Sequence, residues 1–178
     1  MKTLSAAIAL FLLHTALNGS AAQPAEKPEK AKTIYLFRYS MEFNPRLYPQ
    51  KTPKDALASI VKALSDERME YLMAHLADPA YVDPKVDLYK RDYAGGDDAG
   101  KALLAFQRLV RETTKHYFED AELIKELRRF SRDAAWEETE DKAVGNIKEL
   151  PGRQVILRRL EGRWFLKNRQ APEPPPEK

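Results

Sequence analysis

The chain has 178 residues, a formal net charge of +3 at pH 7 and no cysteine. The lack of cysteine excludes a disulfide framework and argues against a lipid-anchored lipoprotein. Positive and negative side chains are interleaved, whereas nucleic-acid binding usually depends on clustered lysine and arginine. We therefore expect no nucleic-acid partner and a fold that is stabilised by its apolar core alone.

Residues 1–22 have the pattern of a cleaved signal peptide. Lys2 is followed by a mostly apolar stretch over residues 4–17, and small residues precede a cleavage site after Ala22. The apolar stretch is short for a membrane span, although a retained anchor is the alternative. We expect a secreted or periplasmic protein with no membrane span in the mature chain.

Two polar segments flank one domain. Residues 23–32 (QPAEKPEKAK) are predicted to be a disordered linker, and residues 171–178 (APEPPPEK) a disordered, proline-rich tail. A proline-rich ligand for a partner protein is the alternative interpretation of that tail. Residues 33–170 then form a single domain, which is an ordinary size for one core.

The first half of this domain is predicted to be largely helical. Residues 33–39 (TIYLFRY) favour a strand because they are rich in β-branched and aromatic side chains. Thr52 is predicted to cap an amphipathic helix with proline at its first position. Asp66 is predicted to cap a second helix, which carries His75 at the border of its apolar stripe and ends at Asp78-Pro79.

The middle of the chain is dominated by one long helical periodicity. Residues 81–93 fit either a short helix or a loose strand, and residues 94–100 (AGGDDAG) a flexible loop. Apolar side chains then recur at helical spacing over residues 101–130. We expect a break near Glu119-Asp120, because acidic residues favour a new helix N-terminus.

After residue 132 the periodicity changes to that of strands. Residues 134–138 and 143–149 are predicted strands, and a glycine turn at residues 150–153 leads into a closing hairpin over residues 154–168. Its two-residue turn is Glu161-Gly162. The alternation of strand side chains then places four apolar residues on one side of the hairpin: Val155, Leu157, Trp164 and Leu166. Arg159 lies on the same side and is expected to cover the Trp164 ring.

These elements predict an α+β fold in which N-terminal helices pack on a curved, C-terminal antiparallel β-meander. The segment 52–79 (TPKDALASIVKALSDERMEYLMAHLADP) resembles the opening helices of the nuclear-transport-factor-two-like, or SnoaL-like, α+β cone superfamily. Residues 162–166 (GRWFL) resemble its final strand. The resemblance implies helices inside a cone-shaped sheet, and it is compatible with isomerases, dehydratases, cyclases and plain binding modules alike.

One pair of side chains suggests acid–base chemistry. His116 and Asp120 are four residues apart on a predicted helix, where a carboxylate would orient an imidazole and raise its pKa. The pair also lies in a highly charged stretch, so a solvated surface pair is the alternative. Asp92, Asp97 and Asp98 lack calcium-loop spacing. We expect no metal and no cofactor.

Aromatic residues are the other candidate binding groups. Tyr89, Tyr93, Tyr117 and Trp136 lie where the helices give way to the sheet, which would be the mouth of a cone. The sequence favours an exported, non-catalytic module that binds a small apolar ligand or a protein partner. The alternatives are a small cofactor-free enzyme that uses His116 and Asp120, and an envelope-associated structural protein. A homodimer is compatible with all three.

Overall fold

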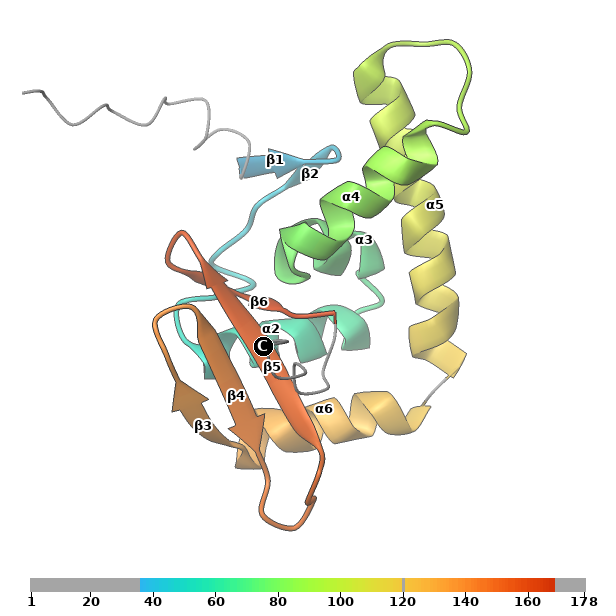
Figure 1. Ribbon diagram of the computed structural model, residues 1–178. Helices are drawn as coiled ribbons and strands as arrows, with labels where there is room; N and C mark the ends of the chain where they lie inside the picture. The colour runs from blue at the N-terminus through green and yellow to red at the C-terminus, as the bar shows by residue number, and fades with distance from the viewer. Residues whose placement is uncertain (1–35, 120, 169–178) are drawn as a thin grey trace, which may run out of the picture.

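A computed structural model describes residues 36–119 and 121–168, apart from the side chains of residues 116, 118, 119 and 121. It confirms the α+β class, with helices preceding the main sheet (Figure 1). The helices are α2 (Pro53–Ser65), α3 (Met69–Tyr71), the π-helix η1 (Leu72–Leu76), α4 (Pro79–Lys90), α5 (Asp98–Glu119) and α6 (Ala121–Asp133). Strands β3 (Ala135–Glu138), β4 (Lys142–Asn146), β5 (Gln154–Leu160) and β6 (Arg163–Leu166) form an antiparallel sheet in chain order. A small hairpin pairs β1 (Phe37–Arg38) with β2 (Met41–Glu42).

The closing hairpin has the predicted register. Arg159 pairs with Trp164, and Leu157 pairs with Leu166. Both turn residues have positive φ, 49° at Glu161 and 77° at Gly162, as a type I′ turn requires. The Arg159 guanidinium lies 5.7 Å from the centroid of the Trp164 ring, which confirms the expected contact.

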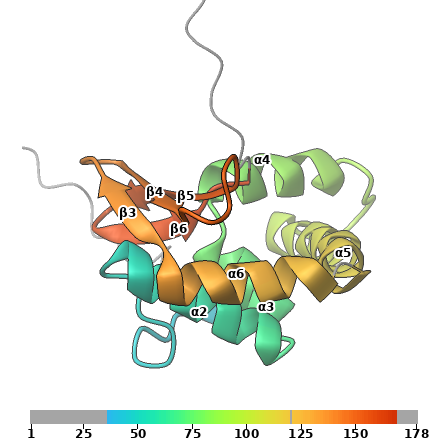
Figure 2. The same ribbon diagram turned by 90° about the horizontal axis from the view of Figure 1, so that it is seen from below.

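Helices cover the apolar side of this hairpin. Figure 2 shows α2 and α6 lying together beneath the sheet, and both α2 and η1 contact β6. Helices α4 and α5 pair with each other beside the sheet rather than under it (Figure 1). Trp164 is 2% exposed and Leu157 is fully buried, so side chains pack closely on this part of the hairpin.

All five residues of the π-helix η1 are buried. The sequence predicted His75 at the border of an apolar stripe, but on η1 this residue is only 1% exposed. The reason is the hairpin β1–β2, which covers this side of η1. The His75 Nε2–H donates to the Met41 carbonyl at 2.9 Å, and the buried Arg38 donates to the Ala74 carbonyl at 2.7 Å. The His75 Nδ1 atom is buried and has no hydrogen-bond partner among the described residues.

A second set of polar contacts ties the β1–β2 hairpin to the helices α4 and α5. Arg38 and the Tyr39 hydroxyl both donate to the carboxylate of Asp83 on α4. The Tyr39 ring stacks on Phe106 of α5 with the ring centroids 4.3 Å apart. Burial, followed by the contact with Asp83, raises the pKa of the Tyr39 hydroxyl.

Two helix boundaries differ from the sequence prediction. Asp66 ends α2, where its backbone N–H donates to the Lys62 carbonyl, and it does not start the following helix. The second helix ends just before Asp78-Pro79 as predicted, since η1 stops at Leu76. The same dipeptide also begins α4, which was not predicted, because the Asp78 carboxylate accepts from the Ala80 N–H at 2.9 Å. The ambiguous segment 81–93 is therefore mostly helical. The break between α5 and α6 falls where it was predicted.

Thr52 caps α2 as predicted, and its removal provides a first test of the fold. The Thr52 hydroxyl accepts from the Asp55 N–H at 3.1 Å. Thr52→Ala is expected to lower the free energy of unfolding by about 1 kcal/mol, because one helix N–H loses its acceptor. Thr52→Ser keeps the hydroxyl and is the matched control. Urea denaturation curves that coincide for the two variants would contradict the capping role.

Candidate functional site

A cleft lies where α4, α5 and α6 meet the end of β6. It consists of three hollows that share lining residues. The outer pocket, of about 520 Å³, lies between the start of α4 and strands β4 and β5. The inner pocket, of about 400 Å³, lies between α6 and the apolar side of β5 and β6. A small connecting cavity of about 20 Å³ shares Tyr81 with the outer pocket and Tyr117 with the inner one. Asn168 lines all three, so they meet around this residue.

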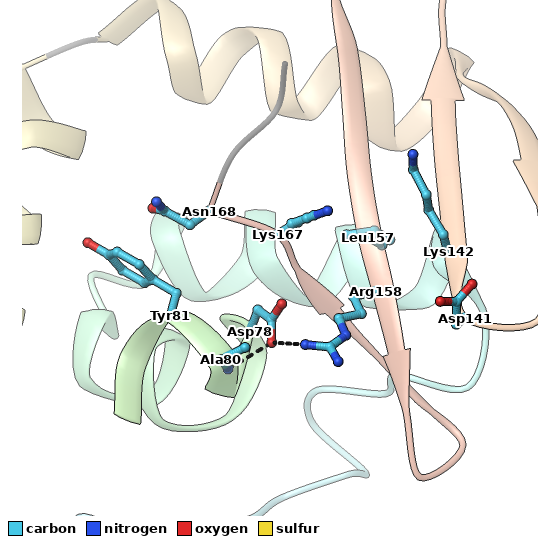
Figure 3. A pocket seen from close by; sticks show the side chains of 9 residues that line it. All are labelled: Asp78, Ala80, Tyr81, Asp141, Lys142, Leu157, Arg158, Lys167 and Asn168. Carbon is cyan, nitrogen blue, oxygen red and sulfur yellow. Dashed lines mark hydrogen bonds and ion pairs between the residues drawn. The ribbon is translucent and has the colours of Figure 1, made fainter. Parts of the chain in front are cut away.

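The outer pocket is rich in cations. Lys142 pairs with Arg158 across β4 and β5, and Arg158 pairs with Phe165 on β6. Lys167 follows Phe165 by two residues, so the alternation of strand side chains places its ammonium on the same side of the sheet. In Figure 3 the Lys142 side chain runs away from the Asp141 carboxylate, and Tyr81 lies at the opposite end of the pocket.

The two carboxylates of the outer pocket already have partners. Asp78, whose side chain is 6% exposed, accepts from the Ala80 N–H and lies 3.6 Å from an Arg158 guanidinium nitrogen (Figure 3). The Asp141 carboxylate accepts from the Thr139 hydroxyl at 3.2 Å. Arg158 is thus partly neutralised, whereas Lys142 has no ion pair with any described residue.

The inner pocket combines apolar walls with charged side chains. Leu127 and Phe130 of α6 face Val155 and Leu166 of the sheet across it. Two glutamates and two cations also line it: Glu122, Glu126, Arg153 and Lys167. Glu126 accepts from Arg153 Nε at 2.8 Å, and Glu122 lies 2.6 Å from the Lys125 ammonium. The charges therefore largely cancel, and the apolar walls favour an apolar group.

Tyr81 and Tyr117 border the passage between the two pockets. Burial, and secondarily the nearby Tyr81, raise the pKa of the Tyr117 hydroxyl. The Tyr117 hydroxyl is therefore neutral at ordinary pH. Each tyrosine offers the passage an aromatic ring and one polar group, which suits a site for a mixed apolar and polar ligand.

Of the four predicted aromatic binding residues, Tyr117 lines the cleft and the other three do not. The Tyr89 hydroxyl donates to Glu112 at 2.6 Å, and the Tyr93 hydroxyl donates to the Leu104 carbonyl at 3.4 Å, both between α4 and α5. Trp136 packs flat on Gly145 of β4, where an added Cβ would lie 3.0 Å from the ring. It contributes to the sheet rather than to the cleft.

The predicted acid–base pair lies outside the described residues, because Asp120 and the His116 side chain are not described. Backbone geometry places residue 116 on α5, next to Tyr117. In the described part of the chain, no group of three or more metal-ligating side chains is found, and no helix has the length and apolar character of a membrane span.

A separate hollow of about 780 Å³, outside the cleft, lies beside the β1–β2 hairpin and was not predicted from the sequence. Its lining includes Phe43, Tyr48 and Tyr71, and the rings of Tyr48 and Tyr71 stack 4.2 Å apart. The density of aromatic residues between positions 37 and 48 was the available signal. This hollow carries charges of both signs, including Asp66 and Arg68, and it does not reach the main sheet.

The cleft residues Lys142, Arg158 and Lys167 were missed for a different reason. They are separated in sequence and come together only through strand pairing. Comparison with protein-family models, with curated proteins and with solved structures finds no match to this chain.

Proposed function

We propose that this protein is an exported, non-catalytic module that binds a small ligand in the cleft between α4, α5, α6 and the sheet. The observation that carries the proposal is the meeting of two pockets around Asn168, one with walls of Leu127, Phe130, Val155 and Leu166 and the other lined by Lys142 and Arg158. Apolar hollows of several hundred Å³ with a few polar groups are the usual form of small-molecule sites. The export of the protein rests on the signal-peptide pattern of residues 1–22.

The chemistry of the cleft supports binding rather than turnover. Its described lining contains no histidine. The most enclosed carboxylate of the outer pocket, Asp78, already caps α4 and pairs with Arg158. Both contacts are made by Asp78 Oδ1, so this carboxylate has a structural role in the protein. The described groups of the cleft therefore favour holding a ligand.

Binding of a neutral apolar dye tests this proposal. Leu123 is half-buried on α6 and lines the inner pocket. Leu123→Glu places a carboxylate in that pocket and is expected to weaken binding of N-phenylnaphthylamine about tenfold or more, because the dye cannot solvate the charge. Fluorescence titration measures the dissociation constant.

The matched control is Leu104→Glu, since Leu104 is 48% exposed on α5 and lines none of the three hollows. It should leave the dissociation constant unchanged. Equal loss of binding in the two variants, or no saturable binding by the unchanged protein, would contradict the proposed site.

A further inference from the structure

We propose that the ligand of the cleft is an amphipathic anion. Its head group, a carboxylate or a phosphate, binds between Lys142, Arg158 and Lys167 in the outer pocket. Its apolar chain passes Tyr81 and Tyr117 and ends in the inner pocket. This inference rests on the proposed function and names the class of ligand.

The charge of the outer pocket favours an anion. Three cations line it against two carboxylates. Asp78 is engaged with the Ala80 N–H and Arg158, and Asp141 with the Thr139 hydroxyl. Arg158 thus offsets the charge of Asp78, and the Lys142 side chain runs away from Asp141 (Figure 3). An incoming anion would meet the Lys142 ammonium, and charge-assisted hydrogen bonds to an ammonium group are the stronger kind.

The direction of helix α4 also favours an anion in the outer pocket. Its twelve residues begin at Pro79, and the residues of its first turn, Ala80 and Tyr81, line the outer pocket. The positive end of the helix dipole thus faces the space where the head group would lie. Asp78 accepts from the Ala80, Tyr81 and Val82 N–H groups, so the helix acts on the head group through its dipole alone. This effect adds to the lysine cluster but would not define a site by itself.

The inner pocket suits the apolar chain better than the head group. Leu127, Phe130, Val155 and Leu166 provide apolar walls. The charged side chains that also line it are of both signs, Glu122 and Glu126 with Arg153 and Lys167, so an anionic head group gains little net attraction there. An alkyl chain gains from leaving water. The two pockets therefore favour one orientation of the ligand.

The connecting cavity shows how one molecule could occupy both pockets. Tyr81 and Asn168 line this cavity together with the outer pocket, and Tyr117, Leu166 and Asn168 line it together with the inner pocket. The cavity itself is small, about 20 Å³. An occupant of both pockets must therefore displace the Tyr81 or Tyr117 side chain, and a narrow, flexible chain needs a smaller displacement than a rigid ring system does.

Competition with three probes of equal chain length tests the inference. Dodecanoate, dodecyl phosphate and dodecanol are titrated against the full chain in the presence of N-phenylnaphthylamine. Both anions are expected to bind at least tenfold more tightly than dodecanol at low salt, and added salt should narrow that difference. Tighter binding of dodecanoate indicates a fatty-acid ligand, and tighter binding of dodecyl phosphate indicates a phosphate head group.

Lys142→Gln removes one cation from the outer pocket. It should weaken binding of the anions about three- to tenfold and leave dodecanol binding unchanged. Lys148→Gln is the matched control, because Lys148 is exposed after β4 and lines no part of the cleft. The control should bind all three probes as the unchanged chain does.

Three outcomes would overturn the inference. If dodecanol competes as well as dodecanoate and Lys142→Gln has no effect, the cleft binds apolar ligands without an anionic head, and the proposed function survives. If none of the probes displaces the dye and the dye itself does not bind, both proposals fail. If the probes bind only after removal of residues 169–178, the occupant of the cleft is the C-terminal segment of the chain itself.

Discussion

Replacing Trp164 with alanine is expected to lower the free energy of unfolding by about 3–5 kcal/mol, the usual cost of removing a large aromatic side chain from a core. Trp164 is 2% exposed on β6, on the side of the sheet that α2 and η1 cover. Its Arg159 contact would be lost as well. The neighbouring side chains cannot collapse into so large a gap, so a cavity would remain.

Urea denaturation followed by far-ultraviolet circular dichroism measures this loss without relying on tryptophan fluorescence. Leu104→Ala provides the control, because Leu104 is 48% exposed and its truncation should change the free energy of unfolding by about 0.5 kcal/mol or less. Similar urea midpoints for Trp164→Ala and Leu104→Ala would show that the helices do not pack on the Trp164 side of β6 as described.

Acidification is expected to destabilise the protein through His75. Burial, opposed only in part by the hydrogen bond to Met41, lowers the pKa of this imidazole from 6.5 to about 4. The positive charges of Arg38 and Arg163 lower the pKa further. The unfolded chain therefore binds the proton more readily than the folded chain between pH 6.5 and 4. The free energy of unfolding falls as the pH decreases through this window, and the contribution levels off below it.

The size of this loss of stability follows from the lowered pKa of His75. Between pH 7 and pH 4.5, His75 alone should remove about 2.5 kcal/mol from the free energy of unfolding. His75→Gln keeps an N–H donor for the Met41 carbonyl but does not titrate. The comparison therefore uses the pH-dependent difference in stability between the unchanged protein and this variant, which cancels the contribution of the carboxylates. If the two proteins lose stability in parallel, His75 is not the group responsible.

Local rules predicted much of the fold. The register of the closing hairpin followed from a two-residue turn and from side-chain alternation, and both β5 and β6 obey it. The cap of α2 and the break between α5 and α6 followed from residue types at helix ends. These features depend on residues that are close in sequence, and they could therefore be predicted from the sequence alone.

The remaining features depend on contacts between distant segments. The pairing of β1 with β2 buries His75 and Arg38 against η1, and no local pattern shows that a strand pair of two residues each will cover a helix 30 or more positions away. The cleft also depends on contacts between distant segments, because its cations lie on β4, β5 and the end of β6. Tyr117 was predicted as a binding residue, and the structure places it in the cleft.

The central claim is that a ligand occupies the cleft around Asn168, and amide chemical-shift mapping by nuclear magnetic resonance tests it most directly. During titration with dodecanoate, the account predicts shifts at Tyr81, Lys142, Leu127 and Asn168 that saturate together, with the β1–β2 hairpin unaffected. Shifts confined to Phe43, Tyr48 and Tyr71, around the other hollow, would contradict it.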